Sequence, residues 1–152
     1  MRLGRRIAID HGAARIGIAM SSVDALISSP LTTISAGESA LLDVVEVIRE
    51  HEPIEVYVGL PLNLSGEFTK STSDAVAFAR ALSSVVSVEV RLVDERMTTR
   101  AAQGQLQASG KNSKVSRSLI DAAAASLILE GALAFEKTTG AVPGKSLLEI
   151  DA

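Results

Sequence analysis

The chain has 152 residues, of which 47% are hydrophobic and only 3% aromatic, and it contains no cysteine. That length suits one domain with a single sizeable core, which must be built from Val, Ile, Leu and Ala. The lack of cysteine excludes a disulfide framework and a thiolate metal site. The formal net charge of −3 counts against a broadly basic nucleic-acid-binding surface.

The N-terminal segment predicts neither a secretory leader nor a membrane anchor. Its apolar run, Ile7–Ile9, is too short for a leader, and no stretch reaches the ~20 apolar residues that a membrane-spanning helix needs. The most apolar segment, residues 119–135, is interrupted by Asp121, Ser126 and Glu130. We therefore expect a cytoplasmic protein that does not contact a membrane.

The first part of the chain predicts three strands joined by short connections. RRIAID (residues 5–10) is followed by the turn HGAA and by RIGIAMS (residues 15–21), and SPLTTIS (residues 29–35) carries Pro30 near its start. Strands that follow one another this closely form an antiparallel meander, because parallel strands need a long crossover connection.

From residue 39 onward the hydrophobic pattern alternates between helical and strand spacing. The predicted elements are a helix over 39–50, a strand over 53–61, a helix over 71–82, a strand over 88–95, a helix over 98–109 and a long helix over 115–137. Strands separated by helices are normally parallel and joined by right-handed crossovers. We therefore predict an α/β fold with one five-stranded mixed sheet, in which a three-strand antiparallel meander is extended by two parallel strands.

The chain shows no repeat and no internal linker, and residues 1–137 are predicted to form a single domain. The remaining sequence contains Gly140, Pro143 and Gly144 and offers little to pack. We therefore expect residues 138–152 to form a disordered tail.

Polar residues stand at the carboxyl ends of the three strands that are predicted to be parallel. Asp10 ends the first, the stretch from Gly59 to Asn63 ends the fourth, and the stretch from Asp94 to Thr99 ends the fifth. In open α/β sheets, ligands bind outside the carboxyl ends of the strands. The convergence of these polar stretches makes this edge of the sheet the predicted site.

The long helix directs a further acid toward the same sheet. At 100° per residue, Asp121 shares the apolar side of the helix with Ile128, and Glu130 lies on the opposite side. Ser126 and Glu130 are therefore predicted to face solvent. A lone buried carboxylate is costly unless it is paired or binds a metal, so Asp10 and Asp121 are candidates for one shared site.

Each acid also has a purely structural interpretation. Asp10 is compatible with a turn, Glu95 with a helix N-terminus that Asp94 or Thr98 caps, and Asp121 with an ion pair to Arg117 one turn earlier. Three carboxylates drawn together make a different case, because they repel unless they are protonated or a cation lies among them. Carboxylate oxygens without Cys or clustered His select Mg²⁺ or Mn²⁺, and two such ions suit phosphodiester hydrolysis.

Four segments carry a resemblance to a known family. IAIDHGAARIGIA, VGLPLNLSGE, VDERMTT and IDAAAASLILEGAL occur in this order, and together they resemble the YqgF/RuvX family of bacterial ribonuclease-H-like proteins. The match covers residues 5–136. Members are described both as Holliday junction resolvases and as the nuclease that matures the 5′ end of pre-16S ribosomal RNA. The resemblance implies a ribonuclease-H-like fold with helices on both faces of a five-stranded mixed sheet.

The resemblance also implies roles for individual residues. It implies that Asp10, Glu95 and Asp121 are the catalytic and metal-binding acids. The expected substrate-binding residues are Arg15, Gly59, Pro61, Asn63, Arg96, Thr98, Lys111, Lys114 and Arg117. Two segments depart from the family pattern: Ala13-Ala14 replaces a polar or basic pair, and the basic run GKNSKVSR is thinner. Both departures weaken the expected affinity for phosphate, which supplies much of nucleic-acid binding.

The sequence leaves four functional hypotheses. The first is a metal-dependent nuclease acting on structured RNA, with pre-16S rRNA as the substrate that the resemblance implies. The second keeps the chemistry but cuts branched DNA, and symmetric resolution of a junction needs a homodimer rather than a monomer. The third is a non-catalytic RNA- or protein-binding assembly factor. The fourth is an ATP-binding lobe of the actin-like kind, to which DHGAARIG is also similar.

Overall fold

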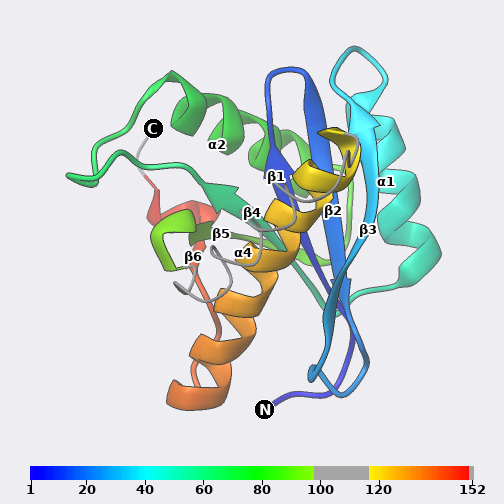
Figure 1. The fold of residues 1–152 in the computed structure, drawn as a ribbon, viewed down its shortest axis with the longest axis vertical. Helices are drawn as coiled ribbons and strands as arrows, with labels where there is room; N and C mark the ends of the chain where they lie inside the picture. Colours follow the sequence, from blue (N-terminus) through cyan, green and yellow to red (C-terminus); the bar gives the residue numbers. More distant parts are fainter. Residues whose placement is uncertain (98–116, 151–152) are drawn as a thin grey trace.

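The computed structural model describes residues 1–97 and 117–150, and the side chains of residues 1–96 and 122–150. At its centre lies a mixed sheet with the strand order β3-β2-β1-β4-β5-β6 (Figure 1). The strands are β1 (Arg6–His11), β2 (Arg15–Ser21), β3 (Ser28–Ser35), β4 (Glu55–Leu60), β5 (Glu89–Asp94) and β6 (Lys145–Ser146). The helices are α1 (Ala40–His51), α2 (Lys70–Ser83) and α4 (Arg117–Thr139), with the 3-10 turns η1 (Glu95–Met97) and η2 (Leu147–Glu149).

Strand pairing brings the carboxyl ends of β1, β4 and β5 together at one end of the sheet, which we call the carboxyl edge. β1 runs antiparallel to β2, with Asp10 opposite Gly17, and parallel to β4. β4 runs parallel to β5, with Leu60 opposite Asp94. The predicted meander of the first three strands and the predicted parallel strands are both confirmed.

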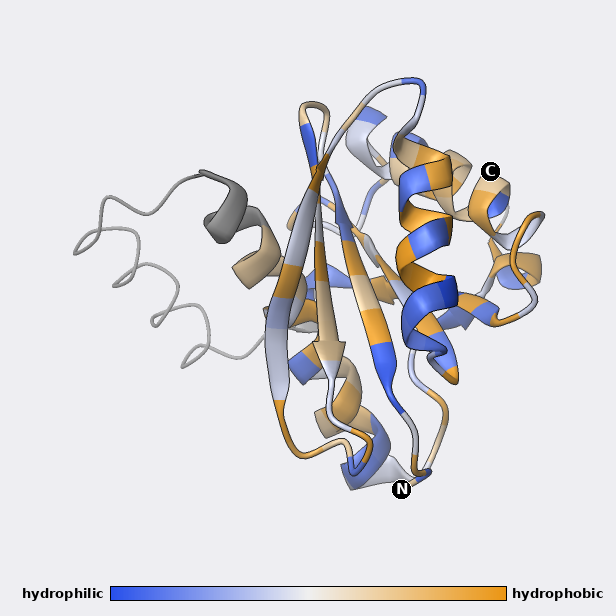
Figure 2. Ribbon diagram, turned by 90° about the vertical axis from the view of Figure 1, so that its right-hand side faces the viewer, coloured by the Kyte–Doolittle hydropathy of each residue, from blue (hydrophilic) through white to orange (hydrophobic). Residues whose placement is uncertain are grey.

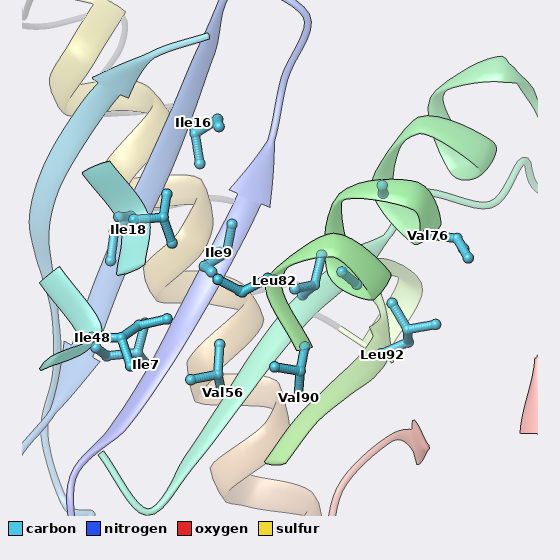
Figure 3. Close-up of a cluster of buried hydrophobic side chains, with 14 of the residues drawn as sticks. Ile7, Ile9, Ile16, Ile18, Ile48, Val56, Val76, Leu82, Val90 and Leu92 are labelled. Atoms are coloured by element: carbon cyan, nitrogen blue, oxygen red, sulfur yellow. The ribbon is translucent and has the colours of Figure 1, made fainter. Parts of the chain in front are cut away.

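Helices cover both faces of the sheet, with α1 and α2 on one face and α4 on the other (Figure 2). Residues of β1 alternate between these faces, as a strand requires. Ile7 and Ile9 belong to the larger core under α1 and α2, where they pack with side chains such as Val56 and Leu82 (Figure 3). Ala8 belongs to the smaller core under α4. Asp10 is two residues after Ala8, so its side chain points to the same face of the sheet, the one that α4 covers.

In the core under α4, alanines from the sheet meet alanines from the helix. Ala8 and Ala19 from the sheet pack with Ala125, Leu129 and Ala132 from the helix, and all five are buried. Small residues on both surfaces allow close packing of a helix on a sheet. None of the helices that the structure describes is long and apolar enough to cross a membrane.

The C-terminal segment differs from the expected disordered tail. Residues 145–146 form β6, which adds a sixth strand to the predicted five by pairing antiparallel with β5. Arg91 fixes this segment, because its Nε donates to the carbonyl of Pro143 at 2.6 Å and its Nη2 to that of Gly144 at 2.9 Å. The side of β5 that faces away from β4 would otherwise present unpaired backbone N–H and C=O groups. The short strand β6 pairs with part of that side.

The prediction for Ser126 was wrong. Ser126 is buried, and its hydroxyl lies 2.9 Å from that of Ser28 on β3, whose hydroxyl also donates to the Ser126 carbonyl. Glu130 is exposed, as expected. Helix α4 packs against β2 and β3 as well as β1. The sheet therefore also buries residues beside the apolar stripe of the helix, among them Ser126. The predicted helix over 98–109 lies outside the described residues.

Candidate active site

Asp10 lies at the end of β1, where the strand reaches the carboxyl edge of the sheet. It is partly buried, whereas Ile9 before it is fully buried. Its partner across the antiparallel ladder is Gly17, a residue without a side chain. The acid therefore interrupts an apolar strand at the position where the strand leaves the core.

Glu95 begins η1 directly after β5, and its carboxyl group lies against β4. A Cβ atom added to Gly59 would lie 2.7 Å from Oε1 of Glu95 and 2.7 Å from Cδ1 of Ile128. The start of η1 is held by Asp94, whose Oδ1 accepts a 2.8 Å hydrogen bond from the backbone N–H of Arg96. A glycine within β4 thus makes room for the carboxyl group of Glu95.

The carboxyl groups of Asp10 and Glu95 form a pair. Burial raises the pKa of Glu95 to about 8, and the negative charge of Asp10 and a hydrogen bond with Asp10 add to this effect. Asp94 contributes a smaller repulsion. Two carboxyl groups can share a hydrogen bond only if one of them holds a proton. A cation between them would take the place of that proton.

The third predicted acid, Asp121, lies on α4, and its side chain is outside the described residues. Its position precedes Ile128 by about two helical turns, and Ile128 reaches Gly59 beside Glu95. Helix α4 also packs against η1. Among the side chains that the structure describes, no group of three His, Asp or Glu residues could hold a metal. The described part of the site is therefore the pair Asp10 and Glu95.

The predicted stretch from Gly59 to Asn63 has a structural role at the same edge. The carbonyl of Pro61 accepts a 2.6 Å hydrogen bond from the hydroxyl of Thr72 in the first turn of α2. The side-chain oxygen of Asn63 accepts from the backbone N–H of Glu67 at 2.7 Å. These bonds fix the loop that follows β4. Gly59 makes space for Glu95, while Asn63 organises the loop.

Two predicted cationic residues lie at the same end of the sheet as the acids. Arg15 begins β2, and its carbonyl accepts a hydrogen bond from Gly12 across the β1–β2 turn. Arg96 follows Glu95, and its guanidinium group is bound by the carboxylate of Asp94, with Nη2 to Oδ2 at 2.7 Å. Of the other predicted cations, Lys111 and Lys114 lie outside the described residues, as does Thr98. Arg117 begins α4, with its side chain outside the described part.

Two features of this edge were not predicted from the sequence. Asp94 was expected only as a cap, yet it also binds Arg96, and this bond lowers the pKa of Asp94. The imidazole of His11 lies 4.9 Å from the ring of Phe78 on α2, and burial lowers the pKa of His11 against the opposing charges of nearby carboxylates. The Asp-x-Arg spacing was a signal for the first contact. No local signal could have shown the second, which joins two distant segments.

A family model described as RuvX, Holliday junction resolvase, matches residues 4–134. The chain belongs to the RuvX family. This confirms the resemblance on which the site residues were assigned. A resolvase cuts nucleic acid, so the RuvX chain belongs to a family of nucleases.

Curated relatives match almost the whole RuvX chain. A protein of Clavibacter sepedonicus is 46% identical over 147 residues, which cover 95% of this chain and 91% of the relative. A protein of Streptomyces avermitilis is 43% identical over 150 residues, with 97% and 96% covered. Both are named "Putative pre-16S rRNA nuclease".

Solved structures of low sequence identity share the fold. One, T. thermophilus RuvC in complex with a Holliday junction substrate, matches with a TM-score of 0.63 at 17% identity, covering 91% of this chain and 99% of that one. Another, the fowlpox virus resolvase with Holliday junction DNA, matches at 0.52 and 10% identity, covering 88% and 97%. The predicted ribonuclease-H-like fold is confirmed, with a sixth strand at one edge of the sheet.

Proposed function

We propose that this RuvX chain is a metal-dependent nuclease of the cytoplasm that hydrolyses phosphodiester bonds in structured RNA, with the 5′ flank of pre-16S ribosomal RNA as its substrate. The observation that carries the proposal is the pair formed by Asp10 and Glu95. Two carboxyl groups from distant segments meet at the carboxyl edge of the sheet, and Gly59 leaves room for that of Glu95. The names of the relatives support the choice of RNA.

The donor set fits Mg²⁺ or Mn²⁺. Carboxylate oxygens suit these hard cations, and the chain has no cysteine that would favour a softer metal. Asp10, Glu95 and Asp121 would hold the metal, which supplies an activated water and a counter-charge for the leaving oxygen when bound. Asp10 lies on a strand and Glu95 on a capped turn. The backbone of both elements is ordered, so the two carboxyl groups are positioned before substrate binds.

The remaining residues of the proposed site bind and orient the substrate. Arg15 and Arg96 lie at the same end of the sheet as the acids and would contact phosphates near the scissile bond. The basic residues that follow them would extend this contact along the strand; they are Lys111, Lys114 and Arg117. Gly59, Pro61, Asn63 and Thr98 would shape the approach of the backbone. Phosphate contacts of this kind position a nucleic acid without reading its sequence.

The first test is cleavage of end-labelled RNA that carries the 5′ flank of 16S rRNA, with Mg²⁺ or Mn²⁺. Loss of a residue that only orients a metal ligand can reduce activity by ~100-fold. Asp10 is proposed as a ligand itself, so we expect Asp10→Asn to reduce cleavage by at least this factor. Metal binding, measured by calorimetry, should weaken in the same variant. Asp24→Asn is the matched control, because Asp24 is exposed in the β2–β3 connection. Unchanged cleavage and metal binding in Asp10→Asn would refute the proposal.

A Holliday junction resolvase is the second candidate, and the description of the family model favours it. A four-way DNA junction should therefore be assayed in parallel with the RNA. Symmetric cutting needs a two-fold dimer, so the oligomeric state should be measured by light scattering at the assay concentration. Preferred cleavage of the junction by a dimer would replace RNA as the substrate. Preferred cleavage of RNA by a monomer would exclude symmetric resolution.

A further inference from the structure

A cavity of about 390 Å³ lies next to η1 and is lined by residues from several segments of the chain. Residues of the loop after β4, the end of β5, β6 and the last described residues line it. Its surface is mainly apolar, with aromatic rings from Phe68 and Phe135. Asp94 and Arg96, the residues on either side of Glu95, both line it. The cavity and the candidate active site therefore share η1.

One wall of the cavity is a guanidinium group that is held in place. Nε of Arg96 donates to both carboxylate oxygens of Asp94 at 3.0 Å, and Nη2 donates to Oδ2 at 2.7 Å. A Cβ atom on Gly66 would lie 3.3 Å from Nη1 of Arg96. Gly66 has φ +82°, a conformation that favours glycine. The loop thus accepts the guanidinium group closely, and Asp94 neutralises part of its charge.

The aromatic ring of Phe68 is placed on a fixed loop but remains 45% exposed. Before it, Asn63 binds the backbone of Glu67. After it, Thr69 caps α2 through reciprocal hydrogen bonds with Thr72. An exposed aromatic residue on an ordered loop is a candidate contact for a partner molecule. Phe68 lines the same cavity as Asp94 and Arg96, the residues on either side of Glu95, so a molecule bound there contacts both the ring and η1.

We propose that this cavity binds an unpaired nucleobase of the strand that is cut beside Glu95; the inference rests on the proposed nuclease function. Aromatic and guanidinium surfaces are what unpaired RNA bases stack upon. Lys145 joins Arg96 at the cavity as a cation for the phosphates attached to such a base. A base within a duplex is stacked and paired, so it cannot enter without first being extruded.

The test measures binding in the Asp10→Asn background, so that no cleavage interferes. The probes are a labelled single-stranded RNA, its fully paired duplex, and versions of the single strand with one base removed at each position in turn. We expect tighter binding of the single strand than of the duplex. Removal of one particular base should weaken binding about tenfold, as the loss of one stacked base does.

Phe68→Ala should weaken binding of the intact single strand by a similar factor and cause no further loss with the RNA that lacks that base. Phe68→Leu should recover part of the affinity, because it restores apolar contact without a ring. Leu64→Ala is the matched control, since Leu64 lies on the same loop, is 98% exposed and does not line the cavity. Circular dichroism melting checks that each variant is folded.

Two outcomes would overturn the inference. One is equal binding of the single strand by the Asp10→Asn protein and by its Phe68→Ala derivative. If the wild-type chain still cleaves RNA in that case, the proposed nuclease function stands. The other is failure of the Asp10→Asn protein to bind any of the probes. Base-dependent binding through Phe68 without any cleavage would instead support the cavity and refute the nuclease function.

Discussion

At the scale of single residues, the site depends on a glycine within a buried strand. Glycine weakens a strand, because it loses more conformational freedom on folding and has no side chain to pack. Gly59 stands in β4 because Glu95 and Ile128 occupy the volume that its side chain would fill. The same residue therefore sets the position of the carboxyl group that pairs with Asp10. A local cost in stability is thus tied to the geometry of the site.

We predict that Gly59→Ala impairs both stability and activity. The added methyl group would meet Glu95 Oε1 and Ile128 Cδ1 at 2.7 Å, so one or both must move. Overpacking of this kind lowers the free energy of unfolding by about 1–3 kcal/mol. The displaced carboxyl group should reduce metal-dependent cleavage by about tenfold or more, because small misplacements of reacting groups are costly. Urea unfolding and the RNA cleavage assay measure the two effects.

The control for this prediction is Gly37→Ala. An added Cβ atom there would meet nothing within 4 Å, so stability and cleavage should stay close to those of the wild type. Full cleavage by Gly59→Ala would show that the position of Glu95 does not limit the reaction.

At the scale of elements, a buried ion-pair cluster fixes α4 to the sheet at the end away from the site. Oε2 of Glu136 on α4 accepts from Nη2 of the fully buried Arg6 at 2.8 Å. Arg2 binds Glu136 as well, and it binds Glu55 on β4 at 2.9 Å. The hydroxyl of Tyr57 donates to Glu55 at 2.8 Å. Because α4 carries Asp121, this cluster helps to set the register of the helix against the sheet.

We predict that Glu136→Gln lowers stability and changes its dependence on pH. Burial alone would raise the pKa of Glu136, but the hydrogen bonds of Arg2 and the charges of Arg2 and Arg6 outweigh it and lower the pKa below 4.5. A lowered pKa stabilises the fold above the unfolded-state value, and this contribution is lost as the pH falls through the folded-state pKa. Removing one charge of a buried pair costs about 3–5 kcal/mol.

Urea unfolding at neutral pH and over a series of acidic pH values tests this prediction. The difference in stability between wild type and Glu136→Gln should be largest at neutral pH and should shrink below pH 4.5, the ordinary value for this group. Glu46→Gln serves as the control, because Glu46 is exposed on α1. A difference that does not vary with pH would show that the charge of Glu136 contributes nothing.

At the scale of the whole molecule, the proposed substrate meets a protein of net charge −3. Repulsion from the remaining surface makes the few cations at the carboxyl edge important for binding. Arg15 and Arg96 lie at this edge, whereas the last turn of α1 lies at the opposite one. RNA binding should therefore be weak at moderate salt and should depend on a small number of positions.

We predict that Arg15→Ala weakens RNA binding by the Asp10→Asn protein equally for all sequences. The slope of log K against log salt, measured between about 50 and 200 mM, should fall in magnitude by about 1, the change expected for one lost phosphate contact. Arg49→Ala is the control, because Arg49 is exposed in the last turn of α1. Equal slopes for Arg15→Ala and its parent would remove Arg15 from the binding surface.

The sequence by itself determined the order of elements and the edge at which the site would form. Periods of two and of about 3.6 residues separate strands from helices, because side chains repeat with these spacings on a half-buried surface. Strands joined by crossover helices are parallel, so Asp10 and Glu95 were predicted to reach one edge although many residues separate them. The family resemblance then assigned them a role.

Only the tertiary structure decided contacts between segments that are distant in the sequence. Ser126 is polar and close in phase to Glu130, but the β2–β3 hairpin covers it. The C-terminal segment contains Gly140, Pro143 and Gly144, yet pairing with β5, the hydrogen bonds of Arg91 and the packing of Leu147 and Ile150 against the larger core order it. The space beside Gly59 and the hydrogen bond between Asp10 and Glu95 depend on how strands and helix pack. Local sequence records the preference of each segment, whereas packing selects the partners that each segment meets.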